Sequence, residues 1–161
     1  MRALYFDLDG TLIGQDTGRP KTALLGGRFE DAVRAASFEA IVCVGSFVAV
    51  IHELVSVRTG YDGPGAILEL CGGAFRDESW FRRTLRLVGD PWNRAAEVPL
   101  DTDWWYVDDL ARSFFSRAGR EGVFRAECGR RICVPQPDGD GSDVLEWLFR
   151  STQPAGQGRR E

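Results

Sequence analysis

The sequence predicts an α/β domain with a mostly parallel central sheet and helices on both faces. Short apolar or aromatic segments of strand length alternate with segments of helical spacing. Three of the apolar segments end abruptly in polar residues, as parallel strands do where ligands bind at their carboxyl ends. The length of 161 residues favours one domain, expected over residues 1–150, and the Gln-, Gly-, Pro- and Arg-rich tail 151–161 is predicted to be disordered.

The first half of the chain is predicted to begin with a buried strand over residues 2–7, an apolar run that ends in a turn. Residues 14–27 are rich in glycine and form a loop or flap. Helical spacing over 29–40 is followed by a second apolar strand, 41–44, and by a strongly apolar helix, 47–57.

The middle of the chain is expected to hold a third strand and a further helix. Residues 60–65 form a loop, and the apolar run 66–70 is expected to be a third strand. Residues 79–88 place their large apolar side chains on one helical face. Two prolines make residues 89–103 irregular.

The last third returns to alternating elements. The aromatic segment 104–107 is a strand, and 110–118 a helix that a glycine closes. Short strands are expected at 122–126 and 131–134, and a final helix at 143–149.

Composition excludes several classes of protein. A net charge of −4 and a pI of about 5.1 make nucleic-acid binding unlikely, since that needs a dense positive surface. No apolar run approaches the roughly 18 residues of a membrane span, and no secretory signal is apparent, so we expect a cytoplasmic protein. The four cysteines form no CxxC pair and there is one histidine, which argues against structural zinc.

The segment Asp7-Leu8-Asp9-Gly10-Thr11 is the most informative in the chain. Two carboxylates two residues apart at a strand end point the same way. Beside a tight turn with backbone N–H groups, such a pair can hold a divalent cation and a phosphate. An ordinary acidic turn is the alternative. Ser46 and the pair Asp108-Asp109 follow two later strands, and all these groups converge if the strands are neighbours.

These three strand ends, in this order, resemble the motifs of the haloacid dehalogenase (HAD) superfamily of phosphatases and phosphotransferases. The first motif is Phe6-Asp7-Leu8-Asp9-Gly10-Thr11-Leu12, the second ends at Ser46, and the fourth is Tyr106-Val107-Asp108-Asp109. The resemblance covers most of residues 2–134 and implies a Rossmann-like three-layer sandwich. The spacing leaves no room for a large cap domain between the motifs.

The resemblance implies a magnesium-dependent phosphomonoesterase. Asp7 would be the nucleophile that forms an aspartyl-phosphate, and Asp9 the general acid and base. Mg²⁺ would be held by Asp7, by the backbone carbonyl of Asp9 and by Asp108, with Asp109 holding a metal-bound water or orienting Asp108. Ser46 would donate its hydroxyl to the phosphate.

The third motif departs from the family pattern. The family expects Lys, sometimes Arg, near the start of the helix before the fourth motif. Lys21 is the only lysine and precedes the second motif. Arg76, just before a plausible helix start at Asp77-Glu78-Ser79, is the predicted replacement as a phosphate ligand.

Substrate and partners remain open. A capless site suits a phosphorylated macromolecule, whereas a flap or a homo-oligomeric neighbour could close over a phosphorylated small molecule. The main alternative is a weak or inactive HAD-like domain that binds a phosphorylated ligand or protein. A phosphoacceptor receiver domain is disfavoured, because it would need an acceptor Asp where Val44-Gly45-Ser46 stands. An interaction module built on Trp104-Trp105-Tyr106 is disfavoured too, because these residues are expected to pack in the core.

Overall fold

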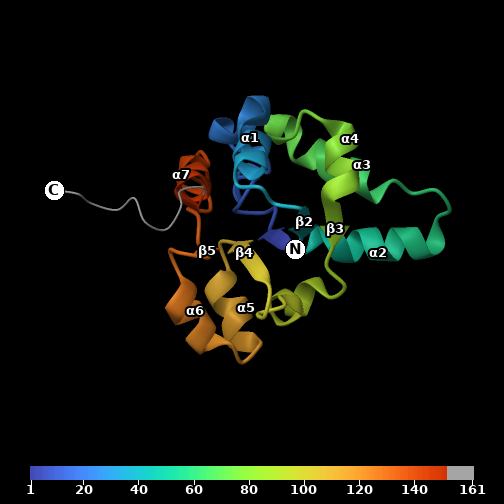
Figure 1. The fold of residues 1–161 in the computed structure, drawn as a ribbon. Helices are drawn as coiled ribbons and strands as arrows, with labels where there is room; N and C mark the ends of the chain where they lie inside the picture. Colours follow the sequence, from blue (N-terminus) through green and yellow to red (C-terminus); the bar gives the residue numbers. More distant parts are fainter. Residues whose placement is uncertain (152–161) are drawn as a thin grey trace.

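The computed structural model, which describes residues 1–151, is built on a five-stranded sheet whose strands are all parallel (Figure 1). The strand order is β3-β2-β1-β4-β5. The predicted α/β class with a parallel central sheet is therefore confirmed. The expected tail begins at Ser151, the last residue of the final helix, and positions 152–161 lie outside the described residues. The strands are β1 (Arg2–Phe6), β2 (Ala40–Cys43), β3 (Leu85–Leu87), β4 (Asp103–Val107) and β5 (Ile132–Cys133).

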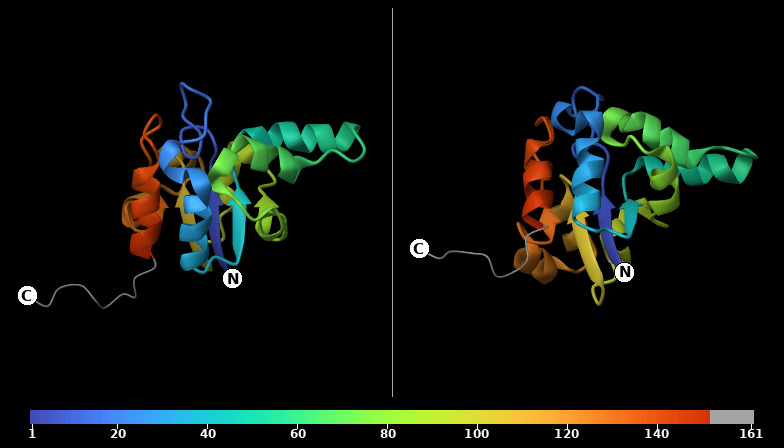
Figure 2. Two further views of the ribbon diagram at one scale, coloured as in Figure 1. Left: turned by 90° about the horizontal axis from the view of Figure 1, so that it is seen from above. Right: turned by 45° about the horizontal axis from the view of Figure 1, so that its top comes forward.

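Helices cover both faces of the sheet (Figures 1 and 2). α1 and α7 pack together on one face, and α5 and α6 lie on the other with the 3₁₀ helix η3. α2 and α3 extend sideways from the body beside β2 and β3 (Figure 2). The bounds are η1 (Thr22–Gly27), α1 (Arg28–Ala35), α2 (Phe47–Val57), α3 (Gly63–Leu70), η2 (Gly72–Ala74), α4 (Glu78–Thr84), η3 (Pro91–Glu97), α5 (Ala111–Arg117), α6 (Glu121–Glu127) and α7 (Ser142–Ser151).

Aromatic side chains fill the core on each face of the sheet. On the α1 face, the Phe29 and Phe75 rings meet edge to face with centroids 5.4 Å apart, and both lie beside Phe6 of β1. On the α5 face, Tyr106 of β4 meets Phe115 edge to face at 5.1 Å. Successive strand residues point to opposite faces, so the aromatic run of β4 serves both layers.

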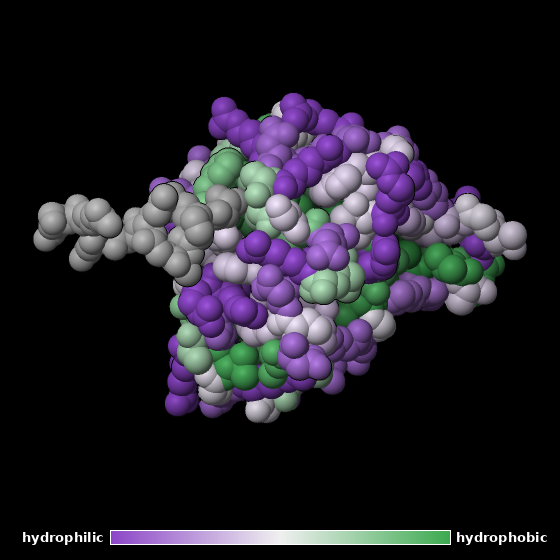
Figure 3. All heavy atoms as spheres, viewed as in Figure 1, coloured by the Kyte–Doolittle hydropathy of each residue, from purple (hydrophilic) through white to green (hydrophobic). Residues whose placement is uncertain are grey.

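The outer side of α2 is apolar and exposed. Val50, Val55 and Val57 are each more than two-fifths exposed, and Figure 3 shows hydrophobic residues along this helix at the right of the molecule. None of the helices in residues 1–151 combines the length and apolar character needed to cross a membrane.

The strand predicted at 66–70 is wrong, because these residues belong to α3. Asp62 caps this helix by accepting a hydrogen bond from the Gly65 N–H at 3.0 Å, and Pro64 lies in its first turn. Both are helix-start signals, and they outweigh the Ile-Leu-Glu-Leu pattern, which strand and helix can share.

The third strand lies further along the chain than predicted. The segment 79–88 divides into α4 and β3, and β3 pairs with β2. Residues 89–103, expected to be irregular, contain η3. The strand predicted at 122–126 is also wrong: these residues lie in α6, where Val123 and Phe124 pack against the core from a helix.

Register brings the predicted strand ends to one edge of the sheet. The Asp7 N–H donates to the Val107 carbonyl at 3.0 Å, and the Val44 N–H donates to the Phe6 carbonyl at 2.9 Å. The first residues after β1, β2 and β4 therefore lie side by side, at the edge where parallel α/β sheets bind ligands.

Candidate active site

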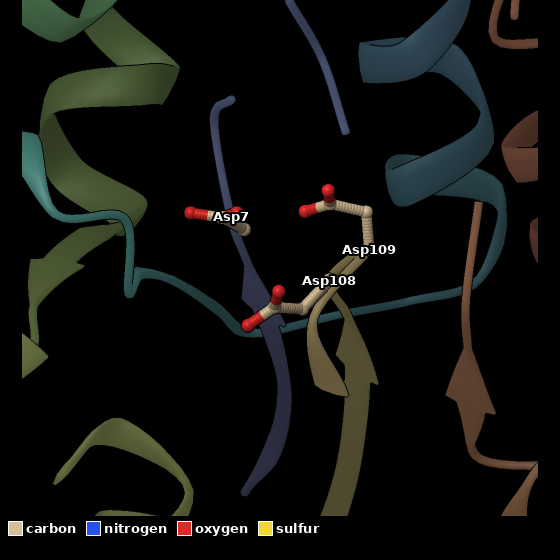
Figure 4. Close-up of side chains that lie close together, drawn as sticks. All are labelled: Asp7, Asp108 and Asp109. Atoms are coloured by element: carbon tan, nitrogen blue, oxygen red, sulfur yellow. The ribbon is translucent and has the colours of Figure 1, made fainter. Parts of the chain in front are cut away.

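Three carboxylates meet at this edge. Oxygen atoms of Asp7, Asp108 and Asp109 all lie within 4.8 Å of one another. Figure 4 shows Asp7 rising from the end of β1, with Asp108 and Asp109 reaching it from the end of β4. The structure thus brings together the first and fourth sequence motifs, which are about 100 residues apart.

Burial disfavours the ionised form of the carboxyl groups of Asp7 and Asp109. Asp7 is only 3% exposed, and burial, reinforced by the charge of Asp108, raises the pKa of its carboxyl well above the usual value. Burial and Asp108 also raise the pKa of Asp109. A site of this kind favours a bound cation, because a cation stabilises the ionised form of each carboxyl.

Arg94 supplies the nearest positive charge. It comes from η3 and is 3% exposed; its Nε donates to Asp108 Oδ2 at 2.8 Å, and its Nη2 lies 3.4 Å from Asp7 Oδ2. Its guanidinium stacks on the Phe114 ring at 3.6 Å. Burial opposes its charge, but Asp7 and Asp108 outweigh burial and raise its pKa.

Asp108 is held by two further donors. The Tyr106 hydroxyl donates to its Oδ2 at 2.9 Å, and the Leu110 N–H donates to its Oδ1 at 2.8 Å. With Arg94, these bonds fix the orientation of a fully buried carboxylate.

Asp109 differs from Asp108, since its Oδ1 is buried without a hydrogen-bond partner among the described residues. An unpartnered buried oxygen is costly unless a ligand satisfies it. Its carboxylate lies against Gly10, where φ is +75° and an added Cβ would collide with it. At Gly45, an added Cβ would lie 2.9 Å from Asp7 Oδ1. Both glycines let the backbone approach the carboxylates closely.

Lys21 also belongs to this region, although sequence reasoning placed it only in the flap. Its side chain is buried, and its Nζ donates to the Gly10 carbonyl at 2.9 Å and to the Gln136 carbonyl at 2.6 Å. Burial lowers its pKa, an effect that Asp143 and Asp109 oppose. Lys21 thereby joins the turn after β1 to the loop between β5 and α7.

The remaining predicted site residues are placed differently. Asp9 is exposed, and its carboxylate is not part of the three-carboxylate cluster. Ser46 is partly buried at the start of α2, next to Gly45. Arg76 bonds to Asp31 of α1, and its side chain is 56% exposed. The structure therefore gives no support to Arg76 as a phosphate ligand.

Arg94 was missed because the third strand was placed too early. With β3 at Leu85–Leu87, the helix before the fourth motif is η3, and Arg94 lies in it. A signal was present in the sequence: Asp90-Pro91 is a helix start, with the Asp90 carboxylate accepting from the Trp92 N–H at 3.0 Å.

Comparison with known proteins adds no relative: no family model, curated protein or solved structure matches this chain.

The raised pKa of Asp7 predicts that Asp7→Asn stabilises the protein at neutral pH. The folded state binds the Asp7 proton more tightly than the unfolded state, so wild-type stability falls as pH rises from the unfolded pKa through the folded one. The amide removes this loss. Urea unfolding with a chelator should show a higher free energy of unfolding for the variant at pH 7, and a smaller difference at acidic pH.

Asp101→Asn, at an exposed position, is the matched control and should show no such pH-dependent gain. A variant at Asp7 that is less stable than wild type at pH 7, or whose advantage does not change with pH, would contradict this interpretation.

Lys21→Met should destabilise the fold by about 2 kcal/mol, because a buried carbonyl left without a donor, here that of Gly10, costs roughly 1–3 kcal/mol, and the bond to the Gln136 carbonyl is lost as well. The measurement is again urea unfolding. Arg28→Met, at an exposed position, should change stability by less than about 0.5 kcal/mol. Equal effects of the two substitutions would show that Lys21 does not hold the two segments.

Proposed function

We propose that this protein is a magnesium-dependent phosphomonoesterase of the HAD type that acts through an aspartyl-phosphate. The observation that carries the proposal is the cluster of Asp7, Asp108 and Asp109 around Arg94 at the carboxyl edge of a parallel sheet. The cluster offers a nucleophile, ligands for a cation and a fixed positive charge within one small volume.

The donor set fits Mg²⁺. Magnesium prefers carboxylate and carbonyl oxygens, and the cluster supplies three carboxylates with one unpartnered oxygen on Asp109. Asp7, Asp108 and Asp109 would hold the ion, with the Asp9 carbonyl as a further candidate ligand. When bound, Mg²⁺ offsets the repulsion between an anionic nucleophile and an anionic phosphate.

The chemistry assigned to the chain uses two carboxyl groups. A carboxylate oxygen of Asp7 forms a bond to phosphorus as the ester P–O bond breaks, and protonated Asp9 gives its proton to the leaving oxygen. Ionised Asp9 then takes a proton from water, whose oxygen attacks phosphorus and releases Asp7. Asp9 is exposed, which suits the exchange of protons with solvent that a general acid and base requires.

Arg94 takes the place assigned to the third motif. Its guanidinium contacts both Asp7 and Asp108, so it opposes the rise in the pKa of Asp7 and can share its charge with a phosphate oxygen. Ser46, beside Gly45, is the proposed hydroxyl donor to the phosphate.

One observation favours the alternative, a domain that binds a phosphorylated ligand or protein without turnover. Arg94 bonds the carboxylates that catalysis requires, and a buried ion network of this kind can be purely structural. Under both proposals the ligand carries a phosphate group. We further propose that the protein is cytoplasmic and that it can form a homo-oligomer.

Purified protein with Mg²⁺ should hydrolyse p-nitrophenyl phosphate, and a chelator should abolish turnover. Asp7→Asn should lower kcat by about a thousandfold or more, because it removes the attacking oxyanion, while Asp101→Asn should keep wild-type activity. Phosphate release by the Asp7 variant would refute the covalent mechanism. Absence of wild-type turnover across a panel of phosphate esters would favour the binding domain.

The two candidate arginines can be separated by substitution. Arg94→Gln should lower kcat/KM by about a hundredfold or more, as loss of a charge at a reacting phosphate does, and Arg76→Gln should stay within about twofold of wild type. Arg94→Lys retains a charge and should recover part of the loss if Arg94→Gln folds poorly. Equal effects at Arg76 and Arg94 would contradict the assignment.

A further inference from the structure

A groove between α5 and α6 collects positive charge away from the three carboxylates. It encloses about 500 Å³ and is lined by Arg112, Ser113, Arg117 and Arg125, with Phe124 among its apolar surfaces. Residues 111–131 carry six arginines against two glutamates in a chain whose net charge is −4. The side of the molecule formed by α5 and α6 is therefore basic, although the protein as a whole is acidic.

The arginines of this groove are poorly neutralised. Among the residues that the structure describes, Arg112 makes no ion pair or side-chain hydrogen bond. Arg117 donates to the Trp92 carbonyl at 3.2 Å, which leaves its charge without a carboxylate. Arg125 lies 3.5 Å from Glu121, but the two side chains are 79% and 58% exposed, and such a pair contributes little.

Glu121 is the one acidic side chain that lines the groove, and it is already engaged. Its Oε1 accepts a hydrogen bond from the Ser116 hydroxyl at 2.6 Å. One partly engaged carboxylate cannot balance three guanidinium groups, so the groove has a positive potential that attracts anions.

The larger groove beside α3 and α4 provides a contrast. It encloses about 780 Å³ and also contains arginine, but Arg82 there donates to Asp62 at 2.6 and 2.7 Å and to Glu78 at 2.8 Å. That arginine is neutralised within the protein. Two arginines and three acidic residues line that larger groove, whereas three arginines and one glutamate line the α5–α6 groove.

We propose that the α5–α6 groove is a second anion-binding site, which takes a small organic ligand with two or more phosphate or carboxylate groups. The volume lies within the usual range for small-molecule sites, and guanidinium forks match both kinds of anion. Phe124 offers an apolar contact for the carbon frame of the ligand. The site is distinct from the carboxylate cluster, since none of Asp7, Asp108 and Asp109 lines it.

The test is an amide NMR titration of the magnesium-free protein with pyrophosphate and, in a second arm, with citrate. Saturable shifts should centre on residues 112–125 with either probe, and the tighter probe identifies phosphate or carboxylate as the preferred group. Arg112→Gln combined with Arg125→Gln should weaken binding at least tenfold, because each charge-assisted hydrogen bond is worth about one such factor or more.

Two controls make the result specific. Arg83→Gln, on the exposed side of α4, should leave the affinity within about twofold, and Asp7→Asn should also retain binding. Shifts confined to residues 8–11, an equal loss in Arg83→Gln, or no saturable shift with either probe would overturn the proposal. No turnover is measured, so failure here leaves the proposed phosphatase activity standing, and the reverse also holds.

Discussion

Neutralisation of three closely spaced carboxylates is the constraint on which this structure depends. Asp7 and Asp108 are almost fully buried, and Arg94 is the buried cation that contacts both. Much of the surrounding architecture holds Arg94 in place. Phe114 supports its guanidinium, and Arg120 donates at 2.7 Å to two carbonyls, that of Ala95 within η3 and that of Val98 directly after it. The helices on this face of the sheet thus hold the positive charge of Arg94 beside the carboxylates at the sheet edge.

The same cluster lowers the free energy of unfolding at neutral pH, because it buries acidic groups close together. A carboxyl whose pKa is raised by burial is a liability to the fold at neutral pH, and Asp7 is such a group. Replacement of Asp7 by a neutral residue would relieve this cost, and a perturbed acid in such a cluster supports the proposed binding or chemistry. Gly10 and Gly45 support the same interpretation, since each lacks a side chain where a Cβ would collide with a carboxylate.

The sequence was sufficient for the sheet class and for the meeting of Asp7 with Asp108 and Asp109, because buried strands and their polar ends leave a strong local pattern. It was insufficient for the third strand. Residues 66–70 are apolar in a way that helix and strand share, and the capping signal at Asp62 and Pro64 decided the outcome. Because the third strand was expected at 66–70, Arg76 was predicted as the third-motif residue, and the contacts of Arg94 with Asp7 and Asp108 were not predicted. The position of Lys21 could not be predicted, because contacts between a flap and a loop 115 residues away leave no periodic signature.

Burial of Lys21 has a practical consequence for the surface. It is the only lysine of the chain, so the described surface presents no lysine ammonium to solvent. Acetylation, ubiquitin transfer and amine-reactive cross-linkers all require an accessible amine. Lysine-directed labelling would therefore report the opening of the contacts around Lys21 and not the surface of the folded chain.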